Sequence, residues 1–258
     1  SKRPFFQAAD DRVKPKPVNN LVLDMTQGNM ATLFDHHTDT RDAVLTAAEA
    51  ARSLLVMSNF GLAGLSGLDQ KFTDTCWARG IIFLIESDTV FETLALKLLP
   101  YPDETIIPSS HQDCPAWENP DPHHPYRQIP QGYLDYLTWQ NRRVMLLPEE
   151  TPSGVAVQRM TLAPGLRLDR TVTDPMKHYR RDEKRGLLPL RFNEERVLWR
   201  DSAALFSRAA AQFQPPRAFA WLAQLAEEDW LPPAQLRRLL ALGMANDQAK
   251  VEFYRSER

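Results

Sequence analysis

The sequence predicts an α+β protein, a large mixed globular domain with short β-segments and packed helices over residues 1–258. Its 258 residues are 43% hydrophobic and 25% charged, which is enough to bury a sizeable core. Segments near residues 40–60 and after residue 201 carry Ala and Leu at helical spacing, whereas residues 151–200 hold short alternating segments typical of strands. These observations favour mixed helices and sheets.

The first half of the chain predicts loops, one helix, one strand and a second helix. About the first 40 residues are rich in Pro, Asn and Asp and are expected to form loops with short strands. A helix follows, with Thr40 as its N-cap and Asp42 in its first turn, and it ends near Gly61. Residues 81–85 (IIFLI) predict a strand that gives way, from Ser87 or Asp88, to a helix stopping before Pro100.

The second half begins with a long loop and ends in three predicted helices. Residues 100–132 are rich in proline and contain three histidines, a composition typical of a long functional or docking loop. Regular structure returns from Tyr133. Strands are predicted in GVAVQRMTLAPG and LPLRFNEERVLW, on either side of the charged run 178–185. The helices are expected over 201–213, 216–230 and 233–258.

Composition limits the cellular setting and the partners. The formal net charge of -2 and the pI near 6.3 argue against a protein that coats nucleic acid through bulk positive charge, but leave room for a local basic patch. Cys76 and Cys114 form no CxxC pair, which suits a reducing cytoplasm. No apolar run approaches the ~20 residues of a membrane-spanning helix, so no membrane partner is expected.

The glycine stretch, residues 58–71 (SNFGLAGLSGLDQK), has glycines at a spacing of three. A dinucleotide fingerprint needs GxGxxG directly after a strand, whereas GxxGxxG here follows a predicted helix, and the Gly-Lys-Ser/Thr of a Walker loop is missing. Glycine lets another backbone or a nucleic-acid strand approach closely. Two interpretations remain, a contact loop and a plain loop that ends a helix.

Other clusters also allow two interpretations. His111, Cys114 and the pair 123–124 offer metal-binding side chains, but their spacing matches no zinc pattern, and surface histidines in a loop are the alternative. Arg142–Arg143 follow an aromatic segment and either clamp a nucleic-acid backbone or flank an aromatic core. The run 178–185 is either a solvated hairpin tip or a phosphate contact. No GxSxG or HExxH signature occurs.

Several longer segments resemble one known family in order along nearly the whole chain. They are PFFQ (4–7), DCPAWE (113–118), GYLDYLTWQNRRVMLLP (132–148), DPMKHYR (174–180), LWRD (198–201) and LGMANDQAKVEFYRSER (242–258). Together they resemble the CasA large-subunit family of the type I-E CRISPR Cascade complex. This resemblance is more specific than any single motif.

The resemblance implies a non-catalytic function. In that family the subunit recognises the protospacer-adjacent motif in double-stranded target DNA, aids unwinding and helps recruit the CRISPR helicase-nuclease. The implied partners are crRNA, target DNA, the other Cascade subunits and that helicase-nuclease. No cofactor is implied, and no metal is predicted, because the cysteine cluster of some members has no counterpart in this sequence.

The resemblance also implies site residues. The family's DNA-contacting glycine loop corresponds to Asn59, Phe60, Gly61, Leu62, Ala63 and Gly64, with Gly61 and Gly64 as the main candidates, although consecutive glycines of some members are replaced here by Gly-Leu-Ala-Gly. Phe34 matches an aromatic residue that touches the guide RNA handle and adjoining DNA. Arg167 or Lys177 is the candidate for a basic finger, and Gln224 for a glutamine wedge.

The ends of the sequence and one rival hypothesis complete these expectations. Family members continue into a C-terminal helical bundle that is expected to be absent here, so the chain is interpreted as a fragment of the family's N-terminal domain. The rival is a soluble metal- or His-dependent enzyme whose lid is the Pro/His-rich loop 100–132.

Overall fold

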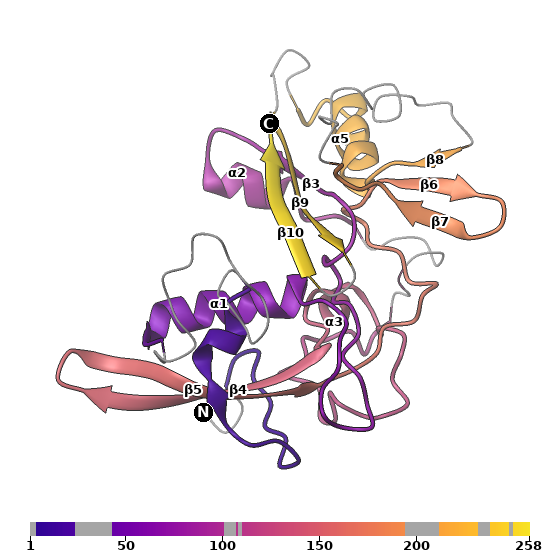
Figure 1. Ribbon diagram of the computed structural model, residues 1–258. Helices are drawn as coiled ribbons and strands as arrows, with labels where there is room; N and C mark the ends of the chain where they lie inside the picture. The colour runs from indigo at the N-terminus through magenta and orange to yellow at the C-terminus, as the bar shows by residue number, and fades with distance from the viewer. Residues whose placement is uncertain are drawn as a thin grey trace. The chain divides into compact units, whose positions relative to one another are not determined.

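The chain divides into two compact units, each built from two separate stretches of sequence. The computed structural model describes residues 4–23, 43–100, 107, 110–193, 212–231, 238–247 and 250–258 (Figure 1). Unit 1 combines Ser1–Cys76 with Ser110–Asp169, and unit 2 combines Trp77–Ser109 with Arg170–Arg258. The expectation of one large domain stays a prediction, because this division does not decide whether the units fold separately.

The sheet of unit 1 is built around one long hairpin. Strands β4 (Arg142–Thr151) and β5 (Gly154–Pro164) pair antiparallel, and Gly154, at φ 112°, provides the positive backbone angle of the turn (Figure 1). On its other edge β5 pairs with the short strands β1 (Lys16–Pro17) and β2 (Leu45–Thr46). The predicted strand in GVAVQRMTLAPG is therefore confirmed.

Helix α1 (Ala47–Phe60) packs on this sheet. A capping box fixes its start, because the Thr46 hydroxyl accepts from the Glu49 N–H and the Glu49 carboxylate accepts from the Thr46 N–H. The predicted start, with Thr40 as N-cap, is wrong: the helix begins at Ala47, and Thr40 itself lies outside the described residues. The predicted end at Gly61 is confirmed.

The core of unit 1 joins α1 and the sheet to the shorter elements. Its largest fully buried members include Leu21, Leu54, Val144 and Met160. The 3-10 helix η1 (Val18–Leu21) contributes to this core, and helix α3 (Tyr133–Leu137) precedes β4.

Unit 2 holds a three-stranded antiparallel sheet in the order β10-β9-β3. Strand β3 (Ile82–Glu86) and helix α2 (Val90–Ala95) confirm the predicted strand followed by a helix. The predicted helix over 233–258 is wrong, because the described residues there form β9 (Arg238–Asp247) and β10 (Lys250–Glu257). Their Leu and Ala residues favour a helix locally, but pairing of β9 with β3 and β10 overrides that preference.

A second small sheet of unit 2 has the order β7-β6-β8, formed by β6 (Tyr179–Asp182), β7 (Gly186–Pro189) and β8 (Phe213–Gln214). Lys184 and Arg185 lie exposed in the β6–β7 turn, where Asp182 accepts both of their backbone N–H groups, as expected of a solvated tip. The helix predicted over 201–213 falls almost entirely outside the described residues.

Helix α5 (Arg217–Glu227) confirms the helix predicted after Pro216. It contributes Ala218 to a core cluster with Ile85 and Leu96. The expected α+β class is confirmed, with mixed helices and strands in several small sheets. No helix within the described ranges is long and apolar enough to cross a bilayer.

Candidate nucleic-acid interface

The glycine loop, residues 61–75, leaves the end of α1 and returns beside itself. The carbonyl of Gly61 accepts from the N–H of Thr75 at 2.9 Å. Further out, Gly64 and Phe72 exchange two backbone hydrogen bonds of 3.0 and 3.3 Å. The loop therefore consists of two antiparallel arms after a helix, unlike a nucleotide-binding turn between a strand and a helix.

Arg142 braces the base of this loop. Its guanidinium donates from Nη2 to the carbonyl of Leu62 and from Nη1 to the carbonyl of Thr73, both at 2.7 Å, so that it links the two arms. It also lies over the Phe72 ring, 4.7 Å from the centroid. Burial lowers the pKa of Arg142 to about 10, opposed by the charge of Asp74, so the side chain stays protonated at neutral pH.

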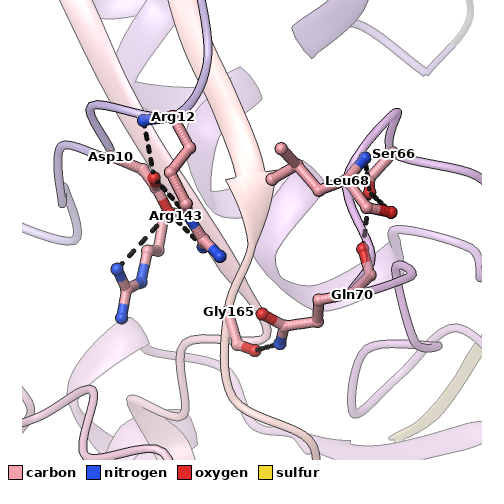
Figure 2. A network of polar contacts seen from close by, with 7 residues as sticks. All are labelled: Asp10, Arg12, Ser66, Leu68, Gln70, Arg143 and Gly165. Atoms are coloured by element: carbon pink, nitrogen blue, oxygen red, sulfur yellow. Dashed lines mark hydrogen bonds and ion pairs between the residues drawn. The ribbon is translucent and has the colours of Figure 1, made fainter.

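The second arginine of the pair, Arg143, joins an ionic cluster in which Asp10 lies between two cations (Figure 2). Arg12 donates twice to Asp10, at 2.8 and 2.6 Å, and Arg143 lies 3.4 Å from the same carboxylate. The hydrogen bond from Arg12 is the main cause that holds the pKa of Asp10 well below its usual range. Since Tyr136 and Trp139 are buried, the arginines flank an aromatic core, as the second interpretation predicted.

The tip of the glycine loop is closed by its own hydrogen bonds and fixed by one long-range contact (Figure 2). The Ser66 hydroxyl accepts from the N–H of Leu68 at 3.0 Å and donates to the carbonyl of Gln70 at 2.5 Å. Gly67, at φ 77°, allows the turn between them. The Gln70 side chain then donates from Nε2 to the carbonyl of Gly165 at 2.7 Å, across 95 positions of sequence.

Gly165 is a firm anchor for that contact. Its N–H donates to the carbonyl of Asn141 at 2.9 Å, the next N–H, of Leu166, donates to Gln140, and the Asn141 amide donates back to Leu166. A Cβ at Gly165 would overlap the carbonyl of Gln140, so only glycine allows this approach. Residues 140–142 therefore hold the loop twice, at the base through Arg142 and at the tip through Gly165.

The predicted contact residues 59–64 lie in the last turn of α1 and the first arm of the loop. Several of their polar groups are engaged within the protein: the Asn59 amide donates to Leu55, and the Ala63 N–H donates to the Asp74 carboxylate at 2.8 Å. The two glycines differ. A Cβ at Gly61 would lie 2.7 Å from a helix carbonyl, whereas a Cβ at Gly64 would meet nothing within 4 Å.

The other predicted residues belong to both units or lie outside the described residues. Arg167 is exposed and lies two positions after Gly165, so the contact of Gln70 brings it to the same part of unit 1 as the loop tip. Lys177 and Gln224 belong to unit 2. Lys177 is buried and bridges to β3, while Gln224 lies on α5 and donates to Glu228 at 2.9 Å. Phe34 lies outside the described residues.

The structure also shows roles in supporting the loop that the sequence does not predict. Ser66, Gln70 and Arg142 support the loop through partners that no pattern in the sequence indicates. The serine within the glycine stretch was the one available local signal, since Ser often closes turns through its hydroxyl. Gln70 and Arg142 reach partners 95 and 80 positions away, which no local pattern reveals.

The proline-rich loop is described at 107 and from 110 onward. Burial, reinforced by Arg143 and Arg127, lowers the pKa of His123 to about 4. Neither of its ring nitrogens has a hydrogen-bond partner among the described residues. Among all the residues that the structure describes, no three His, Cys, Asp or Glu side chains are grouped so that they could hold a metal ion.

Comparisons with known proteins define the family. The chain matches the family described as CRISPR-associated protein Cse1 over residues 1–258. It is 36% identical over 265 residues to the CasA/Cse1 protein of Thermus thermophilus, covering 98% of this chain and 50% of that protein. The crystal structure of Thermobifida fusca Cse1 superposes with a TM-score of 0.78 at 25% identity, over 98% of this chain and 53% of that one.

A chain in a structure described as a CRISPR RNA-guided surveillance complex shares the fold, with a TM-score of 0.73 at 24% identity, over 98% of this chain and 53% of that chain. Because the family match extends over the whole sequence, this chain belongs to the Cse1 family of CRISPR-associated proteins. It spans about half the length of the relatives that it matches.

Proposed function

We propose that this chain is part of a non-catalytic subunit of a CRISPR Cascade complex and recognises the protospacer-adjacent motif in double-stranded target DNA. Its partners are crRNA, the other Cascade subunits, target DNA and the helicase-nuclease that cuts the target DNA. The complex acts in the cytoplasm. Membership of the Cse1 family and the shared fold with a chain of an RNA-guided surveillance complex support this assignment.

The structure of the glycine loop is the main support for this proposal. It presents backbone without side chain at Gly64, where nothing lies within 4 Å of the position that a Cβ would occupy. A duplex can therefore approach the main chain closely at this point. The minor groove offers a degenerate pattern of acceptors, which suits a permissive reading by backbone and a few polar groups.

The charge of the chain agrees with a local contact of this kind. With a formal net charge of -2, it has no bulk positive field to hold DNA. RNA-guided complexes leave the long sequence to base pairing, so the protein needs to read only a short motif. Arg167, exposed beside the anchored segment, supplies one nearby positive charge for a phosphate.

Gly64→Val in the full-length subunit, assembled into its complex, tests the proposal. The added side chain enters open space, so the protein should fold normally while its main chain is kept away from the groove. We expect the affinity for duplex bearing the motif to fall about tenfold or more, which corresponds to ~1.4 kcal/mol. Mobility shifts on targets that differ only in the flanking motif measure this.

Ala51→Val is the matched control, since it enlarges an exposed position of α1 in the same unit. It should leave DNA binding unchanged, and circular dichroism should show both variants folded. Wild-type affinity of a folded Gly64→Val complex would overturn the assignment of DNA recognition to this loop.

A further inference from the structure

The bond between Gln70 Nε2 and Gly165 O holds the tip of the glycine loop to a residue outside the loop (Figure 2). Gln70 is an exposed residue, yet its amide makes a 2.7 Å hydrogen bond to a carbonyl that is itself fixed. Its own main-chain carbonyl is bonded to the Ser66 hydroxyl, so the backbone that carries the amide is also fixed.

The anchor on the other side of this bond is rigid for separate reasons. Gly165 packs directly against the main chain of Gln140 and Asn141, where a side chain has no room. Asn141 is 1% exposed and its amide donates to Leu166 at 3.1 Å, within the same segment that leads to Arg167. A movement of the loop tip relative to Arg167 must therefore break the Gln70 bond.

We propose that Gln70 is a positioning residue that locks the tip of the glycine loop to the segment carrying Arg167, and that this lock sets the discrimination between flanking DNA motifs. The inference rests on the function proposed above and adds to it the residue that fixes the reading geometry. Gln70 acts through the loop and needs no contact with DNA.

A fixed loop discriminates better than a loose one for a physical reason. A loose loop re-packs against an altered motif and recovers part of the lost contacts, as flexible binding surfaces do. A locked loop keeps its main-chain groups at one distance from Arg167, so an altered motif leaves them unmatched. Loss of the lock should therefore weaken binding to duplex that bears the correct motif and leave binding to duplex that lacks the motif unchanged.

Gln70→Met tests the inference, because methionine keeps the length of the side chain and removes the amide donor. In the assembled complex we expect the ratio of Kd values between altered and preferred motifs to fall about twofold to tenfold, the range for one net hydrogen bond. Affinity for duplex lacking the motif should not change. Amide hydrogen exchange of residues 64–72 should become faster.

A double-mutant cycle between Gly64→Val and Arg167→Ala measures whether Gln70 couples the glycine loop to Arg167 in DNA binding. In the wild-type background the two changes should be non-additive in their effect on Kd, and additive when Gln70→Met is present. Gln128→Met, another exposed glutamine of unit 1, is the control and should change neither the exchange nor the Kd ratio.

The outcomes separate this inference from the proposed function. If Gly64→Val abolishes motif binding while Gln70→Met keeps the wild-type Kd ratio and exchange rates, the positioning role is wrong and the proposed function stands. If Gly64→Val has no effect, the proposed function fails and the inference fails with it. A purely structural loss in Gln70→Met would lower binding to both motifs equally, which also contradicts the positioning role.

Discussion

Gly61→Ala should destabilise the protein much more than Gly64→Ala, although the two glycines are three positions apart in one loop. A Cβ at Gly61 would lie 2.7 Å from the carbonyl of Met57 and 3.2 Å from Nε and Nη2 of Arg142. A Cβ at Gly64 would meet nothing within 4 Å. Backbone strain does not enter for Gly61, whose φ is -65°, so the contrast is one of packing.

The expected difference in the free energy of unfolding between the two variants depends on the groups that a Cβ at Gly61 would displace. The Met57 carbonyl belongs to α1, and the Arg142 guanidinium donates to three carbonyls, so a shift of either neighbour costs free energy. Overpacking of this kind costs ~1–3 kcal/mol, and we expect Gly61→Ala to fall in the upper part of that range. At Gly64, alanine removes freedom from the unfolded chain, which stabilises by up to about 1 kcal/mol.

Urea unfolding followed by tryptophan fluorescence measures both variants. Gly61→Ala should move the midpoint to lower urea with an unchanged slope, while Gly64→Ala stays at or slightly above the wild-type midpoint. Equal midpoints for the two variants would refute the argument, because they would show that the close contacts at Gly61 relax without cost. A wild-type midpoint for Gly64→Ala would also show that this position accepts a side chain without loss of the fold, as the DNA-binding test requires.

Three further changes probe other parts of unit 1. Thr46→Ala removes the N-cap of α1 and should lower the free energy of unfolding by ~1 kcal/mol in urea titrations; no change would contradict the cap. Asp135→Ala leaves the partly buried Arg127 without its ion-pair partner and should cost about 3 kcal/mol by the same assay, against a negligible cost for Asp121→Ala at an exposed site. His123 has its pKa lowered from 6.5 to about 4, so the native state binds fewer protons in that window and stability should fall by up to ~1.4 kcal/mol per pH unit as pH drops from 6.5 toward 4. In His123→Gln this pH slope should be smaller, and an identical slope would remove His123 as its cause.

Local patterns predicted the elements whose signals lie within a few residues. The strand at β3, the hairpin strand β5 and the end of α1 at Gly61 were each found from apolar runs, alternation or a helix-ending glycine. The start of α1 was misplaced because Thr40 and Thr46 offer the same kind of cap. The capping box that Thr46 forms with Glu49 distinguishes the true start, and Thr40 has no Glu or Gln three positions later.

Pairing across the fold decided the rest. The stretch that forms β9 has Leu and Ala at helical spacing, and it becomes a strand because β3 on one side and β10 on the other supply its backbone partners. Likewise, the sequence leaves Arg142 with two interpretations, and its burial against the carbonyls of Leu62 and Thr73 determines which holds. Such partners are set by three-dimensional proximity, which spacing along the chain does not encode.

The sequence by itself determined that the chain is an α+β protein with a glycine loop after a helix, because helix ends, turns and apolar periodicity are short-range properties. The resemblance of its longer segments determined the family, which the comparisons confirm. Tertiary structure alone decided how the loop is held, since Arg142 braces its base and Gln70 fixes its tip to Gly165. These contacts join residues 69 to 95 positions apart, and only the folded chain brings such residues within hydrogen-bonding distance.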